Sequence, residues 1–352
     1  MTRRGIHHLT TLVLLASLAG GCTAAVGRRP VVREDGATLS VLRFPAGTRD
    51  VTLRVVEDRG LWLTDAVSVN GRPAGWMVVD TGAGFSTLDR QAARELGVTD
   101  APPWKSWAKD GRDGAAADGA PDGAYRIERL DVAGVSLSNH VIGVIDLGEV
   151  SKTFGRRVAG VLGGDVWGAT PFTLDGPGRR VVLHRRETFR PPAHASAHRL
   201  AIRPPMTKGV YLDANPAAGA PAVDAKIDGV AAPVVLDTGS GVPLTLGRRF
   251  VAEHPRFADP GAPTVAKVAG APGSRGLGGR MLVRGSAKQV EALGATFVCA
   301  DGAVLALRPG DDGGGYLNDD NGGIVGMPFL LHGTLTFDYA RGRVWAEWVV
   351  RR

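Results

Sequence analysis

The sequence is poor in cysteine and in aromatic residues. Only two cysteines occur among 352 residues, and aromatic residues make up 6% of the chain. Two cysteines form at most one disulfide, which excludes a small fold stapled by several bridges. After the first 22 residues no apolar run approaches the length of a membrane-spanning helix. Hydrophobic burial therefore has to stabilise the fold, and 44% hydrophobic residues are enough for two domains.

Signatures of several other enzyme classes are also missing. The chain has no Gly-x-Ser-x-Gly elbow, no His-Glu-x-x-His helix and no P-loop. His194 and His198 are four residues apart, but the neighbouring Pro191 and Pro192 favour a loop over a metal-binding helix. The acidic, Gly-rich stretch 311–321 lacks the spacing of a calcium loop and is predicted to lie on the surface. We expect no metal and no cofactor.

Basic residues outnumber acidic ones, with a formal net charge of +7. They are scattered along the chain and are not interleaved with aromatic residues, so we expect no nucleic-acid partner. The charge is interpreted as an aid to solubility, with a weak attraction to anionic membrane surfaces.

Residues 1–22 have the pattern of an export signal. Arg3 and Arg4 precede a short apolar run, and small residues then lead into Cys22, which resembles a bacterial lipobox. We expect lipidation of Cys22, anchoring to a membrane of the bacterial cell envelope, and a periplasmic or extracellular location. An ordinary signal peptide cut nearby is the alternative. Lipidated Cys22 would leave Cys299 without a disulfide partner, as a buried structural thiol.

The remaining sequence indicates β structure that occurs twice. Fifty glycines punctuate many short Val- and Leu-rich runs. Two of these runs follow an Asn-Gly or Asp-Gly turn, and each ends in Asp-Thr-Gly. The first copy is Asp80-Thr81-Gly82-Ala83, and the second is Asp237-Thr238-Gly239-Ser240.

A second pair of matching blocks follows the first pair in the same order. These blocks are Val161-Leu162-Gly163 and Ile324-Val325-Gly326. The intervals from aspartate to glycine are 163 − 80 = 83 and 326 − 237 = 89 residues. The repeat has the size of a domain, so two homologous lobes are predicted, at 38–184 and 221–352. Residues 185–220 are predicted to link them, with one edge strand.

Two carboxylates from matched positions can carry acid–base chemistry together. Like charges held close cannot both ionise easily, so one carboxyl stays protonated while the other acts as a base. Such a pair can activate a water molecule and protonate a peptide carbonyl. The glycine after each Asp-Thr lets the backbone turn sharply and approach the carboxylate. The threonines are expected to bond inside the junction of the lobes.

The duplicated motifs resemble those of aspartic peptidases, the clan of pepsin-like and retropepsin-like enzymes. The resemblance extends over about residues 60–350 and includes both hydrophobic-Gly blocks. It implies two β-barrel-like lobes related by a pseudo-two-fold axis, with a peptide-binding cleft between them. It also implies catalysis by Asp80 and Asp237 through water, without a cofactor. Because both motifs lie in one chain, we expect a monomer.

Some expected parts of this pattern are harder to place. Ser86 or Thr87 could support Asp80, whereas Val242–Thr245 offers less clear support for Asp237. The mobile flap of the family could correspond to 109–123 or 270–279, although the first stretch could equally be a surface insertion. Thr87–Gly97 is predicted to be a short helix.

Ala83 replaces a hydroxyl residue that the second motif has in Ser240. The loss of one hydrogen bond to the carboxylates favours a less acidic pH optimum.

The leading hypothesis from the sequence is an aspartic endopeptidase anchored in the bacterial envelope. A catalytically silent lipoprotein that binds a peptide or a partner with the same fold is the alternative. A third possibility is a self-processing enzyme in which the segment before Leu61 is removed.

Overall fold

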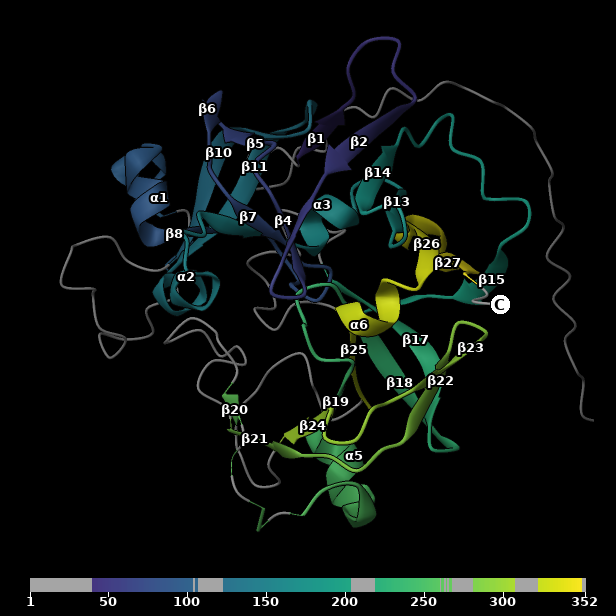
Figure 1. The fold of residues 1–352 in the computed structure, drawn as a ribbon. Coiled ribbons are helices and arrows are strands. Elements are labelled where there is room, and N and C mark those ends of the chain that lie inside the picture. The colour runs from purple at the N-terminus through teal and green to yellow at the C-terminus, as the bar shows by residue number, and fades with distance from the viewer. Residues whose placement is uncertain are drawn as a thin grey trace, which may run out of the picture.

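The structure is a computed structural model, and it describes residues 40–103, 105–106, 123–203, 219–259, 261–262, 264, 266–267, 281–307 and 322–349. It confirms the predicted mainly β fold with two lobes (Figure 1). The N-terminal lobe runs from purple to teal in the figure, and the C-terminal lobe runs from green to yellow. Three sheets make up this part of the chain: one in each lobe and one that strands of both lobes share.

The sheet of the N-terminal lobe curls around the first Asp-Thr-Gly motif. Two short strands join it from outside its main path, one at each of two long neighbouring strands. In spatial order the main path is β3 (Val56–Asp58), β4 (Leu61–Thr64), β7 (Met77–Val79), β12 (Gly160–Leu162), β8 (Thr87–Asp89), β11 (Val135–Ile145), β10 (Gly123–Val132), β5 (Val67–Val69) and β6 (Arg72–Pro73), with β1 (Val41–Arg43) and β9 (Lys105–Ser106) at the side.

The sheet of the C-terminal lobe is built in the same way around the second motif. One strand of the predicted linker, β16 (Ala201–Arg203), pairs with strand β17 (Ala220–Ile227) of this sheet. In spatial order the main path is β20 (Ala266–Lys267), β21 (Met281–Arg284), β24 (Val304–Leu307), β19 (Leu244–Leu246), β25 (Gly323–Gly326), β18 (Val230–Asp237), β17 (Ala220–Ile227), β22 (Gln289–Ala292) and β23 (Ala295–Val298), with β16 (Ala201–Arg203) at the side.

The strands around the two motifs have the same topology. In the N-terminal lobe β12 runs parallel to β7 and antiparallel to β8, and β8 runs parallel to β11. In the C-terminal lobe β25 runs parallel to β18 and antiparallel to β19, and β19 runs parallel to β24. The duplication found in the sequence is therefore a duplication of architecture.

The third sheet joins the lobes. At its centre β13 (Phe172–Asp175) pairs with β26 (Gly333–Asp338) in antiparallel register. The equivalent residues Thr173 and Thr336 face each other, with hydroxyl oxygens 2.8 Å apart. Phe172 stacks on Phe337 beside them, with ring centroids 4.7 Å apart. Its strands are, in order, β15 (Ser196–Arg199), β27 (Arg343–Trp348), β26 (Gly333–Asp338), β13 (Phe172–Asp175), β14 (Arg180–His184) and β2 (Asp50–Arg54).

This shared sheet takes in segments outside the two motif-bearing cores. The predicted linker supplies the edge strand β15, which pairs with β27. His198 lies in this strand and not on a helix. On the opposite edge β2 pairs with β14 and buries Leu53 completely. Because β2 precedes Leu61, removal of the whole segment before Leu61 would take a strand out of the sheet.

Helices are short and lie at the ends of strands. Among the described residues, no helix is both long and apolar enough to cross a membrane. The helices are α1 (Arg90–Glu95), η1 (Val98–Asp100), α2 (Gly148–Phe154), α3 (Gly164–Trp167), α5 (Arg248–Glu253), η2 (Pro255–Phe257), α6 (Met327–Leu330) and η3 (Tyr339–Arg341).

The helix predicted over Thr87–Gly97 begins three residues later than expected. Thr87 and Leu88 belong to β8, because they pair with both β11 and β12. Asp89 then caps α1, accepting a hydrogen bond from the N–H of Gln91 at 2.9 Å. The predicted end is correct, because Gly97 follows the helix in the left-handed conformation with φ of 73°.

Cys299 is a free thiol, 7% exposed, within the large hydrophobic core. Burial, with a smaller effect from the charge of Asp228, raises the pKa of Cys299 to about 11. The thiol is therefore protonated and unreactive at neutral pH, in agreement with the predicted structural role.

Candidate active site

Two buried strands deliver the motif aspartates to the junction of the lobes. Val79, at the end of β7, is 1% exposed, and Leu236, in β18, is fully buried. Asp80 follows β7 directly and donates its N–H to the carbonyl of Leu162 at 3.1 Å. Asp237 ends β18 and pairs with Gly326 of β25. Each aspartate is thus fixed by its own apolar strand and by the neighbouring hydrophobic-Gly element.

The threonines of the two motifs bind across the junction. Thr81 Oγ1 donates to the carbonyl of Leu236 at 2.8 Å and accepts the N–H of Thr238 at 3.1 Å. Thr238 Oγ1 donates to the carbonyl of Val79 at 2.8 Å and accepts the N–H of Thr81 at 2.9 Å. Both side chains are at most 1% exposed. Four buried bonds therefore lock the two loops together with two-fold symmetry, as the sequence predicted for these threonines.

The glycines of the two motifs bring the carboxyl groups together. A Cβ atom placed on Gly82 would overlap the carboxyl group of Asp237, and one placed on Gly239 would overlap that of Asp80. Each carboxyl group therefore packs on the backbone of the opposite motif, where only glycine leaves room. The structure places Asp80 and Asp237 in contact through a shared hydrogen bond.

The environment of the pair favours one shared proton. Burial raises the pKa of Asp80, although hydrogen bonds from Asp237 and from the N–H groups of Ala83 and Gly82 act to lower it. Burial, the charge of Asp80 and the shared hydrogen bond raise the pKa of Asp237 well above its ordinary value. The pair therefore titrates as a unit that holds one proton between its two carboxyl groups.

The hydrophobic-Gly elements lie directly behind the loops that carry Asp80 and Asp237. Leu162 and Val325 are fully buried, whereas Val161 and Ile324 flank them on their strands. A Cβ atom on Gly163 would overlap the backbone of Phe85.

The same close approach occurs in the C-terminal lobe. A Cβ atom on Gly326 would overlap the carbonyls of Ser240 and Val242. The N–H after each glycine bonds the adjacent loop, from Gly164 to the Ala83 carbonyl at 2.7 Å and from Met327 to the Ser240 carbonyl at 2.8 Å. These elements therefore fix both loops through backbone contacts.

Of the two candidates for support of the first loop, Ser86 has that position. Its hydroxyl accepts the N–H of Gly163 at 2.9 Å and donates to Asp165 at 2.6 Å. Thr87 Oγ1 is buried and has no hydrogen-bond partner in the described part of the chain. Ser86 does not contact the Asp80 carboxylate directly but fixes the end of its loop.

Three residues near the site were missed by sequence reasoning. Trp167 Nε1 donates to the carbonyls of Leu162 and Asp80, at 2.9 and 3.1 Å. Asp165 and His140 form a buried pair, with Asp165 Oδ2 3.0 Å from His140 Nε2. Asp165 carried a signal, a carboxylate two residues after Gly163 inside an apolar run. His140 carried none, because its partner is 25 residues away in sequence.

The expected role of the Ser240 hydroxyl is wrong. Ser240 Oγ donates to the carbonyl of Val242 at 3.3 Å, so it stabilises its own turn and no carboxylate contact is seen for it. The difference between Ala83 and Ser240 therefore does not distinguish the two carboxyl groups through this hydroxyl. Burial of the pair is what raises both pKa values.

Several predictions concern residues that the structure does not describe. The signal segment with Cys22 lies outside the described residues, as do the flap candidate 109–123 except Gly123, the flap candidate 270–279 and the acidic stretch 311–321. Among the described residues no group of His, Cys, Asp and Glu side chains could hold a metal ion.

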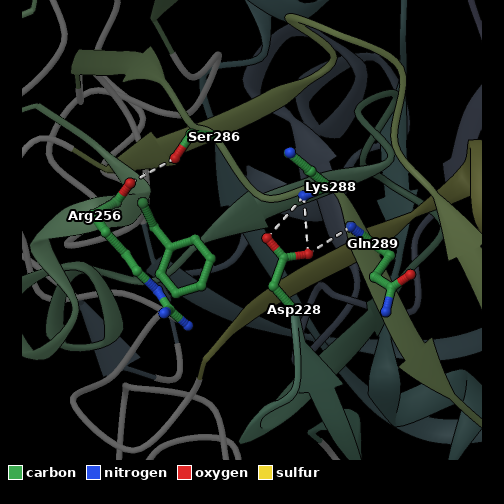
Figure 2. Close-up of a pocket in the computed structure, with 6 residues that line it drawn as sticks. Asp228, Arg256, Ser286, Lys288 and Gln289 are labelled. Carbon is green, nitrogen blue, oxygen red and sulfur yellow. Dashed lines mark hydrogen bonds between the residues drawn. The ribbon is translucent and has the colours of Figure 1, made fainter.

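A surface pocket in the C-terminal lobe lies apart from the aspartate pair. Figure 2 shows the Asp228 carboxylate accepting hydrogen bonds from the backbone N–H groups of Lys288 and Gln289, at 3.0 and 2.8 Å. Across the pocket the Ser286 hydroxyl donates to the Arg256 carbonyl at 2.7 Å. The Asp228 bonds hold the turn between β17 and β18 against the segment before β22, and the Ser286 bond holds that segment against η2. This turn lies at the Val230 end of β18, and an extended strand of that length places Val230 about 23 Å from Asp237 at the other end. The pocket is therefore separate from the aspartate pair.

A comparison with protein families finds a match to the part of the chain around the first Asp-Thr-Gly motif. A family model described as aspartyl protease matches residues 66–166, a range that includes Asp80 and Gly163. This match supports an aspartic peptidase family for the chain. A comparison with curated proteins finds no match.

Solved structures of similar arrangement include basic 7S globulin from soybean, at 14% identity and a TM-score of 0.43, covering 85% of this chain and 95% of that one. Another is the crystal structure of edgp, at 12% identity and a TM-score of 0.46, covering 87% and 96%. At these values neither likeness bears on activity.

Proposed function

We propose that this chain is an aspartic endopeptidase that cleaves peptide bonds with water activated by Asp80 and Asp237. The observation that carries the proposal is the reciprocal packing of the two motifs, in which each carboxyl group rests on the glycine of the other. The raised pKa values of both carboxyl groups and the aspartyl protease match to residues 66–166 support it.

In the proposed reaction the ionised carboxylate of the pair takes a proton from a water molecule as the water oxygen attacks the peptide carbonyl. The protonated carboxyl donates its proton to the carbonyl oxygen, giving a neutral tetrahedral intermediate. As the C–N bond breaks, the protonated carboxyl of the pair gives its proton to the amine nitrogen, and the carboxylate takes a proton from one hydroxyl of the intermediate. A carboxylic acid and an amine are released, and the pair again holds one proton. No covalent intermediate and no cofactor are needed.

We further propose that the peptidase acts as a monomer at the bacterial cell envelope, held by a lipid on Cys22. The lipobox-like sequence before Cys22 and the presence of both motifs in one chain support this. Metabolic labelling with a fatty acid tests the anchor, since Cys22→Ala should abolish the label and release the protein from membranes.

Hydrolysis of casein and of a peptide library, from acid to neutral pH, tests the activity. The full chain purified in detergent should cleave peptides, and a pepstatin-type inhibitor should block the cleavage. The optimum should lie above about pH 3, because both carboxyl pKa values are raised and pepsin-like pairs titrate near 1.5 and 4.7. Absence of cleavage at every pH would reject the proposal in favour of a peptide-binding lipoprotein.

A further inference from the structure

A buried polar network lies behind the loop that carries Asp80. Asp165 Oδ1 accepts hydrogen bonds from the Ser86 hydroxyl at 2.6 Å and from the Ser86 N–H at 2.9 Å, and Oδ2 lies beside His140 Nε2. The three residues are at most 2% exposed. An isolated carboxylate in such a core would be strongly unfavourable, so its full set of partners is required.

This network is connected to the Asp80 carboxylate through short backbone contacts. Ser86 Oγ accepts the N–H of Gly163 at 2.9 Å, and the next residue, Gly164, donates its N–H to the Ala83 carbonyl at 2.7 Å. Ala83 in turn donates its own N–H to Asp80 Oδ1 at 2.8 Å. Loop 80–86 is therefore hydrogen-bonded at Ala83 and at Ser86 to the turn that contains Gly163 and Gly164. Asp165 holds that arrangement through its bonds to Ser86.

The C-terminal lobe forms the same fold without this network. Ser86 is six residues after Asp80, and Pro243 is six residues after Asp237. Asp165 is two residues after Gly163, and Pro328 is two residues after Gly326. Neither proline has a side-chain donor or acceptor, and the Gly326 N–H bonds the Pro243 carbonyl instead, at 3.1 Å. The network is thus a feature of one lobe and not a requirement of the architecture.

We propose that Ser86, Asp165 and His140 are positioning residues for Asp80. They hold loop 80–86 so that the Asp80 carboxylate keeps one fixed orientation towards the attacking water, whereas the loop of Asp237 has prolines at the two equivalent positions and no such network. This inference rests on the proposed peptidase function. The two aspartates of the pair are then held in different ways, although both begin the sequence Asp-Thr-Gly.

Three variants and one control variant test the role by kinetics. Ser86→Ala and Asp165→Ala should each lower kcat about tenfold or more and leave KM within about twofold, because a small displacement of a catalytic group costs rate. Asp165→Asn should stay within about threefold of the wild type. Its oxygen can accept the bonds from Ser86, and His140 in its other tautomer can accept the amide N–H and donate to Ser40, 3.2 Å away.

Thr87→Val is the matched control. It removes a buried hydroxyl from the neighbouring residue, one that has no hydrogen-bond partner in the described residues, so kcat should be unchanged. If Ser86→Ala keeps a kcat within about twofold of the wild type, or falls no further than Thr87→Val, the proposal is wrong. It is also wrong if Asp165→Asn loses as much activity as Asp165→Ala, since hydrogen-bond geometry would then not be what matters.

Amide hydrogen exchange tests the same claim without turnover. In Ser86→Ala and Asp165→Ala the Ala83 amide should exchange about tenfold faster, although neither side chain bonds it directly, while the Met327 amide of the other lobe should be unchanged. A wild type without activity whose Ala83 amide responds in this way would refute the peptidase and keep the positioning role. An active wild type whose Ala83 amide and kcat are insensitive to both variants would refute the positioning role alone.

Discussion

Asp237 is the residue at which the chemistry of the site and the stability of the fold are most directly linked. A carboxyl group with a raised pKa in the folded state binds a proton that the unfolded chain has already lost. Its contribution to folding therefore becomes more unfavourable as pH rises from the unfolded pKa towards the folded one. Because burial and Asp80 raise the pKa of Asp237, this unfavourable window begins near pH 4 and extends upward.

Asp237→Asn is accordingly expected to make the protein more stable at pH 7 and to change its stability less at pH 4. Asparagine is neutral at both pH values, and its side chain can still accept the Gly239 N–H and donate to Asp80. Thermal unfolding of wild type and variant at the two pH values measures this. If the variant gains less stability over the wild type at pH 7 than at pH 4, the raised pKa of Asp237 is contradicted.

Glu95→Gln is a control of opposite sign. Hydrogen bonds from Arg157 lower the pKa of the exposed Glu95, so its contribution is present above the unfolded pKa and disappears as pH falls. The variant should be slightly less stable than wild type at pH 7 and more nearly equal to it at acid pH.

Single residues were predictable from the sequence where a repeated pattern marked them. Asp80 and Asp237, their threonines and their glycines appear twice at matched positions, and the structure brings them together. Ser86 could not be separated from Thr87, because both are short hydroxyl residues and only the register of β8 decides which one faces Asp165. His140 joins the network through folding alone.

At the scale of elements, the two hydrophobic-Gly strands determine where the loops of Asp80 and Asp237 lie. β12 runs between β7 and β8, and β25 runs between β18 and β19, so each sits between the strand that enters its loop and the strand that leaves it. The sequence indicated these strands as short apolar runs. The start of α1 was misplaced, because the pairing of Thr87 and Leu88 in β8 overrides their helical pattern.

Gly326→Ala is expected to destabilise the protein by at least about 2 kcal/mol, because the new methyl group would overlap two backbone carbonyls that cannot move independently. Gly241→Ala is the matched control. A methyl group there would make only ordinary contacts, the nearest at 3.6 Å, and should change stability by less than about 1 kcal/mol. Urea unfolding compares them, and equal effects of the two substitutions would contradict the close approach at Gly326.

At the scale of the whole molecule, one chain supplies both halves of the site. The shared sheet pairs β13 of one lobe with β26 of the other, and the threonine bonds cross the same junction. The sequence predicted this arrangement because the motifs recur in order at nearly equal intervals. An edge strand was predicted in 185–220, where β15 lies, but the sequence could not show that β15 and β2 join the shared sheet, since both lie outside the repeated blocks.

Peptide hydrolysis by the wild type, by Asp80→Asn, by Asp237→Asn and by an equimolar mixture of the two variants tests the central claim most directly. The wild type should cleave, and each variant should be slower by about 10²- to 10⁴-fold, because a general acid–base partner is lost. The mixture should remain as inactive as its components, since each molecule carries its own pair. Wild-type rates in either single variant, or recovery of activity on mixing, would contradict a catalytic pair formed by Asp80 and Asp237 within one chain.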